Sequence, residues 1–179
     1  EQTAILVGGG VGIPPMLYLA AVLENRAIAF AGATTRDLLP LTLTSDPSDP
    51  LVPQQIVAEF SRRGIASIVT TDDGTLGHKG FVTDALERWL ADPIASRKSQ
   101  IANPVLYTCG PEPMMKKVQQ IAQEHRLPCQ IAVERSMACG MGTCQSCCIR
   151  VAADRAADGW RYKLACTDGP VFAGEQLLW

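Results

Sequence analysis

The sequence lacks a long uninterrupted hydrophobic run, which argues against a helix that crosses a membrane. Its longest nearly apolar stretch covers residues 11–23 and is interrupted by Pro14 and Pro15. A spanning helix needs roughly 18 to 20 apolar residues. Neither a basic leader nor a small-residue cleavage site follows Glu1, so we expect a cytoplasmic protein, or a chain whose start lies upstream.

Blocks of like charge and internal repeats are also missing. The net charge is −2 over 179 residues, so we expect neither a nucleic-acid partner nor a membrane-surface partner. The two histidines, His78 and His125, have no nucleophile or carboxylate pattern around them and are assigned no catalytic role. The apolar fraction of 47% is enough for one ordinary domain with a small appendage.

Short apolar runs alternate with helical patterns along most of the chain. We expect strands at residues 4–7, 28–31, 65–70, 104–109 and 129–133, and helices at residues 16–25, 54–63, 81–90 and 114–125. This order predicts an α/β fold with a five-stranded parallel Rossmann-like sheet and helices on both faces. Ligands of such folds bind at the carboxyl ends of the strands.

The composition changes after Glu134, where glycine and cysteine become frequent. We therefore expect a nucleotide-binding domain over residues 1–134 and a small cluster-binding domain over residues 135–179. Strand-like residues 149–151 and 162–166 predict a short antiparallel element, with an extended hairpin around residues 154–160.

The seven cysteines form a poor disulfide framework, because four of them crowd into residues 139–148. Cys139, Cys144 and Cys147 have the spacing C-x4-C-x2-C, and Cys166 follows 19 residues later. This spacing is typical of plant-type [2Fe-2S] loops, whose potentials lie at about −400 mV. Small neighbours such as Gly140 leave backbone N–H groups free to face the sulfur atoms. The sequence therefore predicts a [2Fe-2S] cluster on these four cysteines.

Two alternatives remain open for the cysteine loop. A zinc site would use the same thiols, although such sites more often show paired C-x2-C units. A slip by one residue would replace Cys147 with Cys148, which otherwise is a core or neighbouring thiol.

A glycine-rich turn joins the first strand to the first helix. Gly9, Gly10 and Gly12 are placed to bring backbone N–H groups and a helix N-terminus to a pyrophosphate. The strict G-x-G-x-x-G pattern fails because Ile13 occupies the last glycine position, so a purely structural turn stays possible. No acidic residue directly follows the second strand, and Arg36 leaves the choice between NADH and NADPH undecided.

Five segments spread over the chain together resemble the electron transfer subunit of bacterial dihydroorotate dehydrogenase, within the ferredoxin-reductase superfamily. They are residues 8–14, residues 71–75 with 80–83, residues 109–115, residues 134–144 and residues 166–172. The resemblance implies that NADH can reduce FAD and that single electrons cross the [2Fe-2S] cluster between FAD and FMN in a partner subunit. In the physiological direction, that subunit oxidises dihydroorotate to orotate and the electrons run to NAD. Related subunits of sulfide dehydrogenases, NADH-dependent ferredoxin:NADP oxidoreductases and hydrogenases look similar. A non-enzymatic redox-sensing or structural metal module is the alternative from another class.

The resemblance also assigns roles to individual residues. It implies that Gly9, Gly10 and Gly12 face the nucleotide phosphates and that Asp73 and Thr75 line the nucleotide cleft. In the same way, Gly110 and Pro111 would lie near the nicotinamide and flavin rings together with the catalytic positions Cys109 and Glu134. From the residues alone, the local sequence around Asp73 and Thr75 favours a plain turn, and Cys109 is equally compatible with a buried thiol.

An FAD-binding barrel precedes the nucleotide domain in this family, and its flavin motif is absent from this sequence. We expect the barrel to be supplied in cis or in trans. The isolated chain should then hold its cluster yet oxidise NADH poorly.

Overall fold

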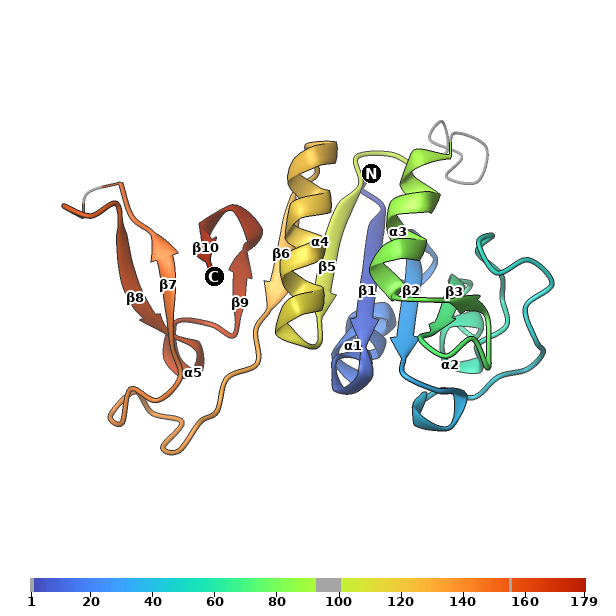
Figure 1. Cartoon of the computed structure of the whole chain (residues 1–179), viewed down its shortest axis with the longest axis horizontal. Helices are drawn as coiled ribbons and strands as arrows, with labels where there is room; N and C mark the ends of the chain where they lie inside the picture. The colour runs from blue at the N-terminus through green and yellow to red at the C-terminus, as the bar shows by residue number, and fades with distance from the viewer. Residues whose placement is uncertain (1, 93–100, 155) are drawn as a thin grey trace.

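The computed structural model describes residues 2–92, 101–154 and 156–179. In this part of the chain, a large mixed sheet with helices on both faces lies beside a smaller antiparallel sheet (Figure 1). The prediction of an α/β fold with a parallel sheet and a short antiparallel element is confirmed at this level.

The large sheet has seven strands in the order β4-β3-β2-β1-β5-β6-β9, rather than the five expected. Its strands are β1 (Ala4–Gly9), β2 (Ala27–Ala33), β3 (Ala66–Thr71), β4 (His78–Lys79), β5 (Val105–Cys109), β6 (Cys129–Ala132) and β9 (Val171–Ala173). All five expected strands are present and parallel. The two additions are β4, which has only two residues, and β9, which pairs antiparallel with β6. The sequence pattern did not predict either strand. Strand β4 is too short to show alternating hydrophobic residues, and β9 joins this sheet from the cysteine-rich segment, far from β6 in the sequence.

Helices cover both faces of the large sheet. They are α1 (Ile13–Leu23), α2 (Ala58–Ser61), α3 (Val82–Ala91) and α4 (Glu112–His125). Helix α5 (Ala165–Asp168) instead contacts residues 160–164 of the cysteine-rich segment. The 3-10 turns are η1 (Gly10–Gly12), η2 (Glu24–Arg26), η3 (Arg36–Leu38) and η4 (Gly174–Gln176). Helices α1 and α2 pack on one face, whereas α3 and α4 lie side by side on the other (Figure 1).

The helix expected at residues 54–63 is wrong in extent, since α2 has only four residues. Gln54 instead pairs with Ser67 through two backbone hydrogen bonds of 3.0 and 2.8 Å, beside the first residues of β3. This pairing holds the backbone near Gln54 extended, so that helix formation is delayed until Ala58. A tertiary contact thus overrides the local helical pattern.

Alternation along the strands divides the core into two layers. Ile5 and Val7 on β1 face α3 and α4, whereas Leu6 faces α1 and α2. On the first face, Trp89 of α3 meets Phe30 of β2 edge to face, with ring centroids 5.4 Å apart. Burial of such side chains contributes roughly 1.5–3 kcal/mol each, which anchors the helices whose N-termini border the site.

The small sheet has the order β10-β7-β8, with strands β7 (Cys148–Ala152), β8 (Trp160–Leu164) and β10 (Leu177–Leu178). Strands β7 and β8 form the expected antiparallel hairpin, from Cys148 opposite Leu164 to Ala152 opposite Trp160. The expected strand at residues 162–166 ends early, because Cys166 lies in α5. The apolar side chains of this sheet belong to the same core cluster as those of α4.

None of the helices within the described residues combines the length and apolar character that crossing a membrane requires.

Candidate functional site

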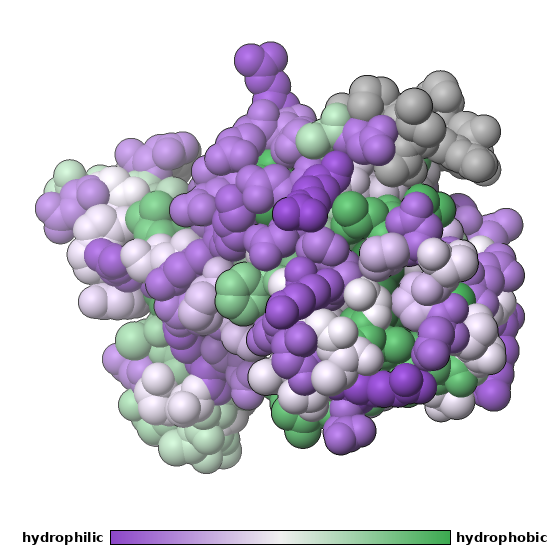
Figure 2. Space-filling model, turned by 45° about the vertical axis from the view of Figure 1, so that its right-hand side comes forward, coloured by the Kyte–Doolittle hydropathy of each residue, from purple (hydrophilic) through white to green (hydrophobic). Residues whose placement is uncertain are grey.

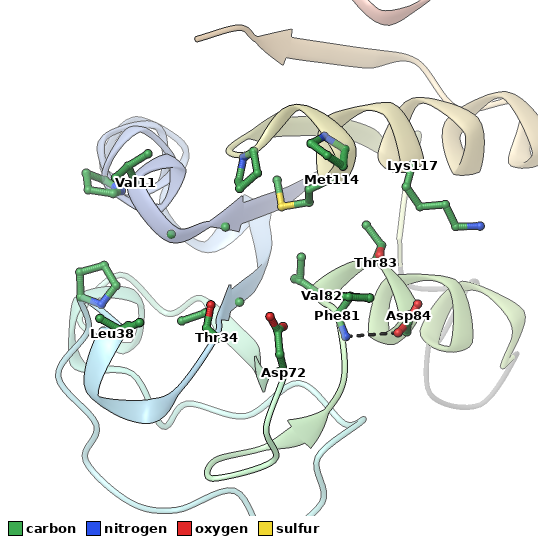
Figure 3. Close-up of a pocket in the computed structure, with 18 residues that line it drawn as sticks. Val11, Thr34, Leu38, Asp72, Phe81, Val82, Thr83, Asp84, Met114 and Lys117 are labelled. Atoms are coloured by element: carbon green, nitrogen blue, oxygen red, sulfur yellow. Dashed lines mark hydrogen bonds between the residues drawn. The ribbon is translucent and has the colours of Figure 1, made fainter. Parts of the chain in front are cut away.

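The carboxyl ends of the central strands open into a cavity of about 900 Å³. It is lined by Gly9 at the end of β1, by Gly10 directly after it and by Thr34 after β2. Figure 3 shows Met114 of α4 pointing toward this space from one side, with Val82 of α3 and Asp72 next to each other across from it and Leu38 farther along the wall. Such a crevice, at the point where helices leave β1 and β5 on opposite faces, is the usual ligand site of open α/β sheets.

Two glycines allow the turns after β1 and β5 to approach each other closely. A Cβ atom on Gly12 would lie 2.0 Å from the carbonyl oxygen of Cys109. Gly110 has a φ of 151°, and a Cβ atom there would lie 2.9 Å from the carbonyl oxygen of Gly9. The structure therefore places Gly9 and Gly10 on the cavity wall and Gly12 behind it, in contact with the neighbouring turn.

The turn after β3 supplies the acidic side of the cavity. Asp72 lines the wall, and its pKa is raised by partial burial and by the nearby charges of Asp73 and Asp84. The Asp73 carboxylate points to its own turn, where it accepts hydrogen bonds from Thr75 N at 3.0 Å and Thr75 Oγ1 at 2.7 Å. Donation from Thr75 lowers the pKa of Asp73. Asp73 and Thr75 thus shape the turn, whereas the adjacent Asp72 faces the cavity.

Thr75 also connects this turn to the segment after β2. Its hydroxyl accepts a hydrogen bond of 3.0 Å from the backbone N–H of Arg36. The Arg36 guanidinium lies 3.4 Å from the Asp46 carboxylate, and both side chains are largely exposed. The acidic turn and the segment that follows β2 are therefore held together beside the cavity.

A second, polar cavity of about 430 Å³ lies beside the larger one. Gly110, Pro111 and Glu134 line it, together with Ser146 of the cysteine loop. Pro111 also lines the larger cavity, so the two spaces share a wall. Cys109 sits behind this wall at the end of β5, where burial, followed by the charge of Glu134, raises the pKa of its thiol.

An ion-pair network borders the polar cavity at the start of α4. The Glu112 carboxylate accepts hydrogen bonds from Lys116 Nζ at 2.7 Å and from the Arg135 guanidinium. These two cations lower the pKa of Glu112. Arg135 also lies over the indole ring of Trp179, with its guanidinium carbon 6.0 Å from the ring centroid.

The cysteine loop is wound so that backbone N–H groups point at sulfur. Gly140, Gly142 and Gln145 all have positive φ values, which turn the chain sharply between the cysteines. The N–H groups of Met141 and Cys144 lie 3.5 and 3.4 Å from Cys139 Sγ. Such donors stabilise negative charge on thiolate sulfur, as an iron-sulfur cluster requires.

The four predicted ligand cysteines form two pairs. Cys139 interacts with Cys144, and Cys147 interacts with Cys166. Hydrogen bonds from Ser146, and then from Cys139, lower the pKa of Cys144 to about 6. The backbone N–H of Cys166 lowers the pKa of Cys147. Among the described residues, no three His, Cys, Asp or Glu side chains converge as a ready-made site for a single metal ion.

Cys148, the alternative ligand, lies apart from these interactions as the first residue of β7. It is exposed, whereas Cys147 is 2% exposed and lies among the core residues under the loop. The assignment of Cys147 rather than Cys148 as a ligand stays a prediction of the spacing.

Several wall residues were not identified individually from the sequence. Asp72, Asp84, Met114 and Lys117 line the large cavity, and Arg135 and Ser146 line the polar one. Asp72, Met114 and Arg135 fall within the segments that carry the family resemblance, whereas Asp84, Lys117 and Ser146 do not. The local sequence pattern did not show which of these side chains face a cavity.

Comparison with known proteins agrees with this geometry. Residues 134–178 match the model of the iron-sulfur cluster binding domain of dihydroorotate dehydrogenase B. The electron transfer subunit of dihydroorotate dehydrogenase B (NAD(+)) from Caldanaerobacter subterraneus is 34% identical over 177 residues, which are 99% of this chain and 60% of that protein. The subunit of the same name from a Geobacillus species is also 34% identical, over 99% of this chain and 58% of that protein. This chain therefore spans less than two thirds of the length of either relative.

A solved structure has a similar fold over the entire chain. It belongs to a study of flavin-based electron bifurcation by an NADH-dependent reduced ferredoxin-NADP oxidoreductase. The TM-score is 0.73 at 28% identity, covering 100% of this chain and 55% of the other. The relationship expected from the sequence is thus confirmed: the chain is similar over almost its whole length to electron transfer subunits of dihydroorotate dehydrogenase B, and residues 134–178 match their iron-sulfur cluster binding domain.

Proposed function

We propose that this chain relays electrons between NAD(H), FAD and a [2Fe-2S] cluster, within the electron transfer subunit of a dihydroorotate dehydrogenase. The observation that carries the proposal is the shared wall at Pro111. One face of this wall borders the large cavity, and the other borders the polar cavity that reaches Ser146 of the cysteine loop. The candidate two-electron and one-electron sites are therefore neighbours.

The large cavity is proposed to hold NAD(H). The backbone after β1 lines it, and α1 begins directly behind this turn at Ile13, so that N–H groups and a helix N-terminus are available to a pyrophosphate. Asp72 and Asp84 make part of the wall acidic, which disfavours an additional phosphate. These features support NADH over NADPH and support Gly9 and Gly10, rather than Gly12, as the direct phosphate contacts.

Cys139, Cys144, Cys147 and Cys166 are proposed to bind the [2Fe-2S] cluster. A cluster with two irons takes two protein ligands at each iron, and the chain presents its thiols in two pairs. A zinc ion needs all four around one point. When bound, the cluster supplies one-electron transfer between a flavin and an acceptor. The chain's own contribution is to direct N–H groups at the sulfur atoms and to keep Cys147 buried.

The polar cavity is proposed as the place of the flavin ring, with the rest of FAD held by a barrel domain outside the present sequence. Glu134 lies on its wall, in agreement with the role that the resemblance implies. Cys109 directly precedes Gly110 of this wall, and the raised pKa of its thiol keeps the thiol protonated. Gly110 and Pro111 separate the two cavities without a bulky polar side chain.

The division into residues 1–134 and 135–179 stays a proposal. In its favour, the small sheet contains only strands from the second segment. However, β9 from the same segment pairs with β6, and a single core cluster spans both parts. We therefore propose two functional domains that form one folding unit.

The proposed partner is an FMN-containing dihydroorotate dehydrogenase catalytic subunit. The structural relative involved in electron bifurcation supports a second candidate, an acceptor enzyme of the ferredoxin-NADP oxidoreductase type. Transfer of electrons from reduced protein to each purified partner would distinguish these two.

Anaerobic reconstitution tests the proposal directly. We expect about two iron and two sulfide per chain in the wild type. Cys147→Ser should lose most of this content, whereas the matched neighbour Cys148→Ser should retain it. Calorimetric titration should also show NADH binding to the same preparation. A colourless protein that binds zinc but no sulfide would contradict the cluster, and absence of NADH binding would contradict the nucleotide site.

A further inference from the structure

Ser146 contacts both parts of the proposed electron path. Its side chain lines the polar cavity, and its Oγ lies 3.2 Å from Cys144 Sγ. The same Oγ donates a hydrogen bond of 3.2 Å to the backbone carbonyl of Ser136, a residue that lines the same cavity. No residue assignment made above, from the sequence or from the family, gives Ser146 a role in electron transfer.

The hydroxyl has one proton and two partners at the same distance. When Cys144 carries its proton, the thiol can donate to Ser146 while Ser146 donates to Ser136. A cysteine that binds iron has lost that proton, so the contact with Cys144 then requires the hydroxyl to donate to sulfur. In the cluster-bound chain, the sulfur of Cys144 and the carbonyl of Ser136 therefore compete for one donor.

We propose that Ser146 tunes the reduction potential of the cluster by donating its hydroxyl hydrogen bond to Cys144 Sγ. This inference rests on the proposed cluster. Reduction adds one electron to the iron-sulfur group and therefore increases the negative charge on its sulfur atoms, while the proton stays on Oγ and no covalent bond changes. Hydrogen bonds to charged acceptors are roughly twice as strong as neutral ones. The donor consequently stabilises the reduced form more than the oxidised form, and it raises the potential.

The position of Ser146 makes this effect specific to the electron path. Its hydroxyl is the contact between the cavity proposed for the flavin and one ligand pair of the cluster. Around Cys139, the contacts to sulfur come from the backbone N–H groups of Met141 and Cys144. A substitution at Ser146 can therefore remove a donor while the backbone donors remain.

Redox titration of the reconstituted full chain tests the proposal, with the reduced cluster followed by electron paramagnetic resonance. We expect Ser146→Ala to lower the midpoint potential by the equivalent of a threefold to tenfold change in the reduction equilibrium, where tenfold is 59 mV for one electron. Ser146→Thr retains the hydroxyl and should restore a potential near the wild-type value. Met141→Ala is the matched control, because this side chain is 72% exposed and only its backbone N–H faces a sulfur atom.

Iron and sulfide contents separate the possible failures. If the wild type holds no cluster after reconstitution, the proposed function fails. If the wild type and Ser146→Ala hold equal clusters with equal potentials, the role of Ser146 is refuted and the proposed function survives. Ser146→Gly provides a second variant without the hydroxyl, for the case in which the alanine variant does not bind iron.

Resonance Raman spectra give a second readout that does not depend on the measured potential. Exchange from water to deuterium oxide should shift the iron-to-cysteine stretching bands of the wild type, because the exchangeable hydroxyl proton lies on a ligand sulfur. The shift should be smaller in Ser146→Ala or Ser146→Gly than in Met141→Ala. Identical shifts in the hydroxyl-free variants, or unchanged bands in the wild type, would overturn the proposal.

Discussion

Replacement of Gln119 on α4 by leucine should uncouple the C-terminal segment from the large sheet and its helices. Gln119 is 7% exposed, and its amide nitrogen donates to the carbonyl oxygens of Gly174 and of Leu177, the latter at 3.0 Å. Its amide oxygen accepts a hydrogen bond from the indole N–H of Trp179. One buried side chain thus satisfies three polar groups of the segment that carries β9 and β10.

The expected cost follows from the groups that leucine would leave without partners. A buried polar group that loses its hydrogen bond costs about 1–3 kcal/mol. Water can reach Trp179, which is only partly buried, so the two carbonyl groups account for most of the effect. We expect Gln119→Leu to lower the free energy of unfolding by about 2–4 kcal/mol, a large fraction of the 5–15 kcal/mol typical of a domain.

Guanidinium denaturation of the chain without iron measures this change, and hydrogen exchange over residues 171–178 locates it. Gln120→Leu is the matched control, because Gln120 is exposed on the same helix and should change stability by no more than about 0.5 kcal/mol. Equal stability of the two leucine variants, with unchanged exchange in the C-terminal segment, would refute the reasoning.

Three further predictions concern the turns and charges around the site. Gly12→Ala should destabilise the fold by about 3 kcal/mol or more and weaken NADH binding, because the added Cβ atom would overlap the carbonyl group of Cys109. Chemical denaturation measures the loss of stability, and calorimetric titration measures the loss of NADH binding. In the chain without iron, the thiol of Cys144 should be mostly ionised above its pKa of about 6 and should then react readily with iodoacetamide. Peptide mass spectrometry should show the rate of alkylation of Cys144 rising with pH with a midpoint near 6 rather than near 9. The Glu112 carboxylate has a pKa lowered below 4.5, so its stabilising effect is present above pH 4.5 and is lost as pH falls through the lowered value. Urea titrations should therefore show Glu112→Gln less stable than the wild type at neutral pH, with the difference shrinking under acid; a constant difference would exclude the Glu112–Arg135 pair as its cause.

The five parallel strands and the cysteine-rich loop of the C-terminal segment were predictable because their signals are local. Each strand is a short apolar run that ends at glycine or at a polar residue, and each is followed by a helix or a loop. The order of these runs restricts the sheet to a parallel arrangement, with ligands at one edge. The spacing of Cys139, Cys144 and Cys147 identified the loop without any knowledge of its fold.

Side-chain direction at the site was not predictable in the same way. Asp72 and Asp73 are neighbours of the same residue type, yet Asp72 faces the cavity and Asp73 caps its own turn. Only the path of the chain after β3 separates these outcomes. Similarly, Ser146 became a candidate only when the fold placed its hydroxyl between Cys144 and the Ser136 carbonyl.

By itself, the sequence determined the five parallel strands and the spacing of the cysteine loop, because periodicity and spacing act over a few residues. Tertiary structure alone decided that β9 completes the sheet beside β6 and that Gln119 holds the last strand. The partners in each of these contacts lie some 40 to 60 residues apart. Contacts of that range depend on how the whole core packs, and no local pattern encodes them.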